Sequence, residues 1–261
     1  MLCCLLLKSL EAVSQDTLHS YKSISVQQAV AISADGYGNL YVADKQGNIH
    51  SYDSLGNYLL TYSPQEVASV TLIDARSAVR IFAFYRELQS FVLLNRFLTP
   101  IETYRFQLPD GGFVRVATQA ADNTFWLYDD VSFSLKKFDK KLGRILLQTD
   151  LSLLLPDASL DIVQMAEYQN YLFLLANGYG ILQFDNIGNF IRNISVKTPV
   201  FTLHSDAIFY YEDNNIVRKN LYNAQSTKWV LAETTANLKG LAMAGSRLIT
   251  LEENLLRFWQ Y

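Results

Sequence analysis

Acidic side chains recur at one place in this sequence, directly after its short and most apolar runs. Residues 40–43 and 125–128 are two such runs, and a carboxylate follows each of them. The full set comprises Asp44, Glu87, Asp129, Asp130, Glu212, Asp213, Glu252 and Glu253. Gathered on one surface, these groups would attract a basic protein patch or a cationic ligand and would repel RNA. The alternative is that Asp and Glu stand there only because they favour solvated turns.

A second polar set stands at or near the starts of the modestly apolar runs that precede those segments. Its members are Gln28, Arg115, Asp161, Gln164, Asn237 and Lys239. A hydrolase that uses calcium or zinc needs several oxygen ligands converging on one point. Only Asp161 is acidic, and Arg115 and Lys239 bring positive charge, so we expect no metal or other cofactor at these residues. If the modestly apolar runs surround a central channel, the set forms the polar mouth of that channel. A lactonase-like hydrolase or a lyase with its site in the channel is the alternative.

Other catalytic patterns are missing from the sequence. The three histidines, His19, His50 and His204, stand in separate runs without the spacing of a zinc site or a catalytic pair. No serine lies in a Gly-x-Ser-x-Gly elbow. The glycine-rich residues 177–180 are typical of a hairpin turn rather than a phosphate loop. We therefore expect no catalytic residues.

Composition narrows the class of protein further. Half of the 261 residues are hydrophobic and only 18% are charged, which is not the composition of a disordered chain. Tyr and Phe are abundant and favour strands. The formal net charge is -3, which counts against nucleic-acid binding because phosphate neutralisation requires a surplus of Lys and Arg.

The apolar runs repeat. They begin at residues 40, 81, 125, 172, 208 and 248, so the period is near 40 residues. A period of this length built from short strands indicates the blades of a β-propeller. Each unit supplies a small inner strand, the apolar run, a third strand and an outer strand. Asp followed by Gly marks the last turn in three units, at residues 53–56, 139–143 and 185–188.

The sixth unit stops one strand short of four, while residues 17–24 form a strand-like segment without a unit of its own. Pairing the two would complete the ring and leave no open sheet edge. The sequence thus predicts an all-β fold, a six-bladed propeller of four-stranded antiparallel blades whose last blade is closed by the N-terminal strand. We expect residues 15–261 to form this single domain.

Residues 1–14 resemble an export signal. An apolar core over residues 2–7 precedes Ala12-Val13-Ser14, a small-x-small pattern that a signal peptidase could cut before Gln15. The alternative is an ordinary N-terminal apolar helix or strand. Both cysteines, Cys3 and Cys4, lie in this segment, so the mature chain would contain no disulfide. The expected location is exported, either periplasmic or associated with the cell surface.

The first unit carries a family resemblance. Gly38-Asn39-Leu40-Tyr41-Val42-Ala43-Asp44, followed by Asn48-Ile49 and by residues 52–56, resembles the NHL repeat. The resemblance implies a six-bladed propeller with a binding surface at one mouth of its channel, in a branch of uncharacterised exported bacterial proteins. The family includes RNA-binding regulators, protein-interaction modules and a peptide-amidating lyase, so fold alone does not give the function. We expect a non-catalytic scaffold for a protein partner; a small-molecule ligand is not excluded.

One insertion interrupts the regular spacing. Residues 150–160 are rich in leucine and connect an outer strand with the next inner strand. They should lie over the channel mouth, as a plug that buries the leucines or as an exposed contact patch. The aggregation risk of exposed leucines favours the plug.

Overall fold

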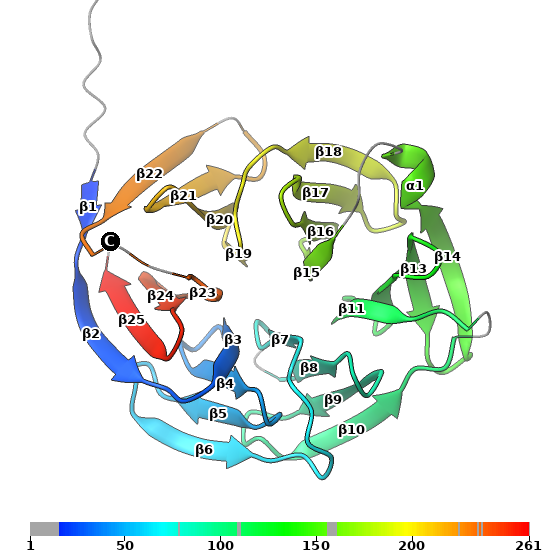
Figure 1. Ribbon diagram of the computed structural model, residues 1–261, viewed down its shortest axis with the longest axis horizontal. Helices are drawn as coiled ribbons and strands as arrows, with labels where there is room; N and C mark the ends of the chain where they lie inside the picture. The colour runs from blue at the N-terminus through cyan, green and yellow to red at the C-terminus, as the bar shows by residue number, and fades with distance from the viewer. Residues whose placement is uncertain are drawn as a thin grey trace, which may run out of the picture.

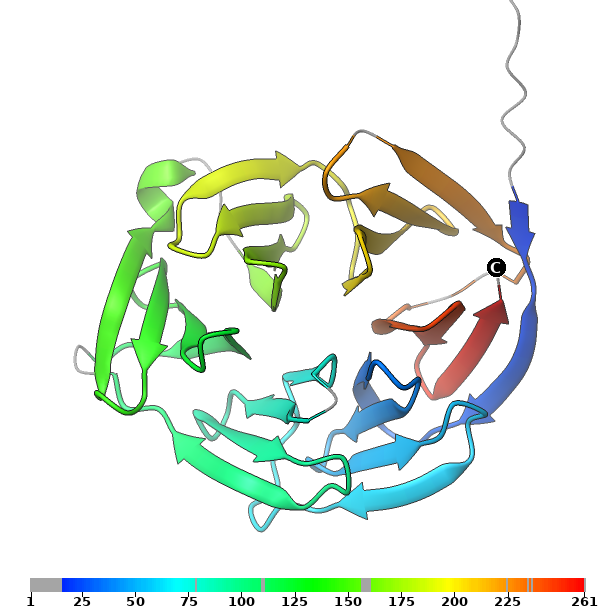
Figure 2. The same ribbon diagram turned by 180° about the vertical axis from the view of Figure 1, so that it is seen from behind.

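The computed structural model describes residues 16–77, 79–108, 111–155, 161–223, 225–233, 235 and 237–260. Their strands form six sheets arranged in a ring (Figures 1 and 2). The six-bladed propeller expected from the repeats is confirmed. The predicted export signal at residues 1–14 lies outside the described residues.

The first three blades follow one another along the chain. Blade one contains β3 (Ala29–Ala34), β4 (Leu40–Asp44), β5 (Ile49–Tyr52) and β6 (Tyr58–Tyr62). Blade two contains β7 (Leu72–Asp74), β8 (Ile81–Tyr85), β9 (Ser90–Leu94) and β10 (Pro100–Arg105). Blade three contains β11 (Val114–Gln119), β12 (Phe125–Asp129), β13 (Ser134–Asp139) and β14 (Arg144–Asp150), and the helix α1 (Leu151–Leu154) follows it.

The last three blades repeat this order. Blade four contains β15 (Ile162–Tyr168), β16 (Tyr171–Ala176), β17 (Gly180–Asp185) and β18 (Phe190–Ile194). Blade five contains β19 (Phe201–His204), β20 (Ala207–Glu212), β21 (Asn215–Asn220) and β22 (Ser226–Leu231). Blade six contains β23 (Gly240–Ala244), β24 (Arg247–Leu251) and β25 (Leu255–Gln260). In Figure 1 the first strand of each blade borders the centre and the fourth lies at the circumference.

Ring closure is confirmed, with one correction. β2 (Ser20–Ser25) pairs antiparallel with β25 and is the outer strand of blade six. The predicted single strand over residues 17–24 is wrong, because the segment is interrupted at His19. The preceding β1 (Asp16–Leu18) pairs in parallel with β22 and adds a fifth strand to blade five. The N-terminal segment therefore joins two blades.

Alternating strand direction gives the ring two distinct faces. We call upper the face that carries the turns between second and third strands and the connections between blades. The lower face carries the turns between first and second strands and those between third and outer strands. On the upper face each turn lies beside the start of an inner strand: the Lys45 amide donates to the Gln28 carbonyl at 3.0 Å. Both predicted polar sets therefore belong to the upper face.

Aspartates shape the turns of blade one. Asp35, Asp44 and Asp53 each accept backbone N–H groups two and four residues further on, at 2.8–2.9 Å. A glycine three residues after each aspartate takes a positive φ, which glycine adopts without steric cost. This local chemistry explains why the first unit is so motif-like.

The blades pack face to face through apolar side chains from their second and third strands. β4, β8 and β12 are buried along their whole length. Blade three also buries an ion pair in this core: Lys136 Nζ lies 2.7 Å from Asp129 Oδ2, with side-chain exposures of 1% and 0%. The largest aromatic cluster lies between blades two and three, where the Phe91 and Phe125 rings stack 4.4 Å apart.

The insertion does not plug the channel, and that prediction is wrong for the part described. α1 lies at the circumference beside β14 (Figure 1). Asp150 caps it by accepting the Ser152 amide at 3.0 Å, and the fully buried Leu151 anchors it to the core of blade three. Leu153 and Leu154 remain exposed. Residues 156–160 lie outside the described residues.

Candidate functional site

The eight acidic residues of the predicted upper-face set divide into two groups. Asp44, Asp129 and Glu252 are buried. Asp44 and Asp129 accept hydrogen bonds within their own turns, and Glu252 lies 2.7 Å from Arg257 Nε. These three stabilise the fold and offer no carboxylate to a partner. The other five are exposed or partly exposed and could contact one: Glu87, Asp130, Glu212, Asp213 and Glu253.

Three residues meet at the upper channel mouth. Arg115 Nη1 lies 2.9 Å from Asp130 Oδ2, and Arg115 Nη2 is in direct contact with Asp161. Arg115 Nε donates to the Ile162 carbonyl at 3.0 Å. Both carboxylates are thereby paired with one guanidinium. Sequence reasoning named Arg115 and Asp161 here and assigned Asp130 to the acidic set, so the structure joins the two sets.

The remaining predicted channel residues do not form one site. Gln164 lies in the channel and bridges β15 to β19, donating to the Phe201 carbonyl at 2.7 Å and accepting its amide at 3.1 Å. Gln28 is exposed, and its backbone N–H donates to Asn254 Oδ1 at 3.1 Å. Asn237 and Lys239 are also exposed, on the connection before β23. Gln164 therefore holds neighbouring blades together.

An apolar patch lies beside the Arg115 cluster on the upper face. The β12–β13 turn supplies Val131 and Phe133, and α1 supplies Leu153 and Leu154. Phe113 joins them because its carbonyl accepts the Asp130 amide at 2.9 Å. The Phe133 carbonyl accepts the Leu151 amide at 3.0 Å, which ties α1 to the same turn. These five side chains, the apolar patch, are between 40% and 80% exposed.

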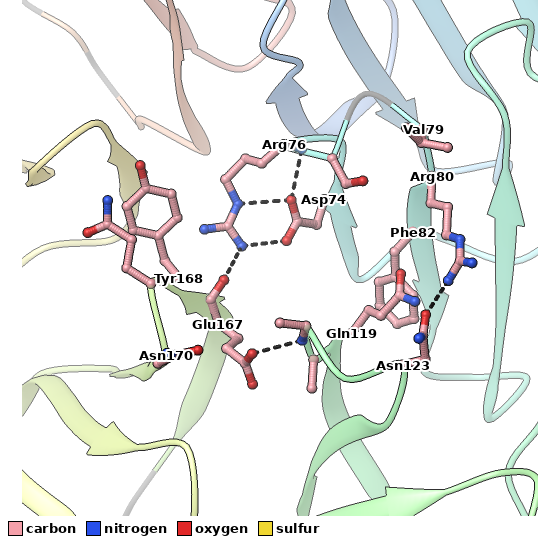
Figure 3. Close-up of a pocket in the computed structure, with 14 residues that line it drawn as sticks. Asp74, Arg76, Val79, Arg80, Phe82, Gln119, Asn123, Glu167, Tyr168 and Asn170 are labelled. Atoms are coloured by element: carbon pink, nitrogen blue, oxygen red, sulfur yellow. Dashed lines mark hydrogen bonds and ion pairs between the residues drawn. The ribbon is translucent and has the colours of Figure 1, made fainter.

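The lower channel mouth holds a cavity of about 460 Å³ that sequence reasoning missed (Figure 3). At its edge Arg76 donates two hydrogen bonds to the Asp74 carboxylate, from Nε to Oδ1 at 2.9 Å and from Nη2 to Oδ2 at 2.5 Å. Arg76 Nη2 also donates to the Glu167 carbonyl at 3.1 Å, and the guanidinium lies 5.5 Å from the centre of the Tyr168 ring. Burial would raise the pKa of Asp74, but the charge and hydrogen bonds of Arg76 outweigh it and hold that pKa below its usual range.

These contacts make the lower mouth suited to binding rather than to acid–base chemistry. Asp74 is locked as an anion by Arg76. The Glu167 carboxylate accepts the Ala121 amide at 2.8 Å and the Trp126 indole N–H at 2.6 Å. Within the described residues, Arg76 Nη1 is buried without a hydrogen-bond partner. Reading the ends of the inner strands, and not only their starts, would have found Asp74 and Glu167.

Replacing Glu167 with Ala is expected to destabilise the propeller by about 2 kcal/mol, because the buried Trp126 N–H loses its acceptor. Glu167→Gln should cost less, since its amide oxygen still accepts one of the two donors. Urea denaturation of both variants measures the difference. Equal stability of Glu167→Ala and the wild type would show that the Glu167–Trp126 bond contributes nothing.

Two further features bear on metal chemistry and on membrane insertion. Within the part of the chain that the structure describes, no group of three His, Cys, Asp or Glu side chains is placed to hold a metal ion. Among the same residues no helix has the length and apolarity needed to cross a membrane.

Compared by sequence, the chain matches no protein family and no curated protein. Compared by structure, it resembles other propellers at low identity. The Cps50 (Swd1) β-propeller domain of Myceliophteria thermophila has a TM-score of 0.69 at 8% identity, covering 94% of this chain and 99% of that one. BamB from Moraxella catarrhalis has a TM-score of 0.53 at 12% identity, and the match covers 94% of this chain and 100% of that one. Virginiamycin B lyase from Staphylococcus aureus has a TM-score of 0.58 at 14% identity, and the match covers 92% of this chain and 88% of that one. At such identities the likeness establishes the fold alone.

Proposed function

We propose that this propeller is a non-catalytic binding and scaffolding module that holds a protein partner on its upper face. The observation that carries the proposal is the apolar patch, five large exposed side chains contributed by one turn, one helix and the start of blade three. Apolar groups gathered in this way on a folded domain are typical of an interaction site, whereas single exposed apolar residues are not.

Charge indicates the chemistry of the partner. Asp130 borders the apolar patch, and Glu87, Glu212, Asp213 and Glu253 lie elsewhere on the same face. Protein interfaces combine an apolar centre with a polar rim. The partner surface should therefore present an apolar anchor flanked by Lys or Arg.

Phe133 gives independent support. Its φ is 49°, a left-handed conformation that costs a bulky residue about 1–2 kcal/mol. Its side chain is half exposed, so burial within the chain offsets little of this cost. An aromatic residue kept under strain at the surface is expected where its ring contacts another molecule.

Phe133→Asn is expected to abolish partner binding without lowering stability, because Asn tolerates a positive φ better than Phe and removes the ring. Affinity purification from the source cells, followed by mass spectrometry, measures the binding, and thermal unfolding measures stability. Tyr179→Asn, also on the upper face but outside the apolar patch, is the matched control and should retain the partner. Undiminished recovery with Phe133→Asn would refute the proposed site.

The acidic residues should set the salt dependence of this binding. Neutralising Asp130, Glu212 and Asp213 to their amides is expected to weaken recovery of a basic partner and to flatten its decrease with added salt. A partner retained equally by this variant, at both low and high salt, would leave the apolar patch as the whole interface and contradict a role for the acidic residues.

Export and family are further parts of the proposal. The resemblance of blade one to the NHL repeat and the signal-like residues 1–14 support an exported bacterial protein, periplasmic or at the cell surface. Mass spectrometry of the protein from its native source should find a chain that begins at Gln15, in the periplasmic or surface fraction. A chain that begins at Met1 in the cytoplasmic fraction would refute export.

A hydrolase or lyase site in the channel is the alternative, and the meeting of Arg115, Asp130 and Asp161 at the upper mouth favours it. Elemental analysis of the purified protein separates the two readings. Stoichiometric calcium or zinc that is lost with Asp161→Asn would support the enzyme. Retention of metal by that variant would place the metal elsewhere.

A further inference from the structure

Each of the five turns between a third and an outer strand presents one large apolar side chain to solvent. These side chains, which we call the apolar tips, are Leu55, Phe97, Leu142, Ile187 and Tyr222. Their exposed fractions fall between 57% and 63%. All five turns lie on the lower face, opposite the apolar patch.

The same type of side chain-to-backbone hydrogen bond fixes the backbone of each apolar tip. In each turn a single Asp or Asn side chain accepts the backbone N–H of its tip residue, at 2.8–3.1 Å: Asp53, Asn95, Asp139, Asp185 and Asn220. The same type of turn on the upper face of blade one has Gln46 where the lower turn has Leu55. The turn geometry therefore does not itself require an apolar residue at that position.

Cations accompany all five tips. Lys22 donates to the Leu55 carbonyl, and the Arg96 guanidinium lies 4.7 Å from the centre of the Phe97 ring. Lys141 immediately precedes Leu142; Lys140, one residue earlier, is in contact with Glu102 and is already paired. Lys137 donates to the Asn186 carbonyl beside Ile187, and Arg192 donates to the Leu221 carbonyl beside Tyr222, each at 3.2 Å. Lys137 is itself buried and lies 2.8 Å from Asp122, so its charge is already paired.

We propose that the lower face docks on an anionic lipid bilayer through the apolar tips and the cations Lys22, Arg96 and Lys141. The tips come from five different blades around the ring, so they do not form the continuous apolar centre of a protein interface. A bilayer accepts separate apolar groups along a flat boundary, and anionic headgroups attract the Lys and Arg beside them. The acidic upper face then points away from the membrane.

Vesicle co-sedimentation tests the proposal with purified protein. Binding to vesicles of phosphatidylcholine and phosphatidylglycerol should exceed binding to phosphatidylcholine alone and fall as salt rises. Replacing three tips with serine, Leu55→Ser, Leu142→Ser and Ile187→Ser, should lower partitioning about tenfold or more. The matched control, Val67→Ser, Val163→Ser and Tyr179→Ser, removes three exposed apolar residues from the upper face and should bind as the wild type does.

Fluorescence locates the contact. The three native tryptophans are buried, so an added tryptophan reports its own surroundings. Emission of Ile187→Trp should shift to shorter wavelength with anionic vesicles, and that of Val67→Trp should not. Absence of vesicle binding, or equal shifts at both positions, would overturn the proposal. So would tip-dependent sedimentation without vesicles, which would assign the tips to a second copy of the chain.

Discussion

A chain that begins at Val26 is expected to unfold at least about 10 °C below the full protein, because it lacks the outer strand of blade six. β2 pairs along β25 from Ser20 to Ser25. Its removal exposes one edge of that blade and opens the ring between blades five and six. Calorimetry or circular dichroism measures the transition.

Two shorter truncations serve as matched controls. A chain that begins at Asp16 keeps both β1 and β2 and should melt with the full protein. One that begins at Ser20 loses only β1, whose three residues pair with β22, and should lose a few degrees. An unchanged melting temperature in the chain from Val26 would contradict closure of the ring by the N-terminal segment.

Lys136→Met is expected to cost about 3–5 kcal/mol of unfolding free energy, the usual result of removing one partner from a buried ion pair. Met preserves most of the aliphatic volume of Lys, so the loss comes from the Asp129 carboxylate that stays buried without its cation. Asp129→Asn together with Lys136→Met should be more stable than Lys136→Met alone. A loss below about 1 kcal/mol would show that other donors suffice for Asp129.

The same pair should respond to pH. Burial raises the pKa of Asp129, but hydrogen bonds from Lys136, Ser132 and the backbone outweigh it and lower the pKa overall. A lowered folded-state pKa stabilises the protein above the unfolded value, and this stability is lost as pH falls through the folded value. The difference in unfolding free energy between the wild type and Lys136→Met should therefore become smaller below about pH 4.

The repeats alone predict most of the fold, because each blade is specified locally. Apolar second strands and Asp–Gly turns recur with the spacing of the blades, and the edges of a propeller must be closed. The split at His19 was not predictable in this way. Whether residues 16–18 extend blade five or blade six depends on contacts with β22, which is distant in sequence.

The candidate sites were less predictable, because exposure depends on turn geometry. Asp44 and Asp130 are both acidic turn residues in the sequence. The Asp44 carboxylate is buried and accepts N–H groups of its own turn, whereas Asp130 stays accessible. Arg76 was missed because its partners, Asp74 and the Glu167 carbonyl, come from two different blades. The leucines of α1 were placed over the channel, although Leu151 fixes the helix at the circumference.

Site-specific photo-cross-linking in the source cell tests the proposed function most directly. A photoactivatable amino acid in place of Phe133 should give one discrete protein adduct, and the same probe in place of Leu142 on the lower face should give none. Adducts of the same protein from both positions, or from Leu142 alone, would contradict the upper face as the partner site. So would the absence of an adduct at Phe133 in a variant that folds and locates as the wild type does.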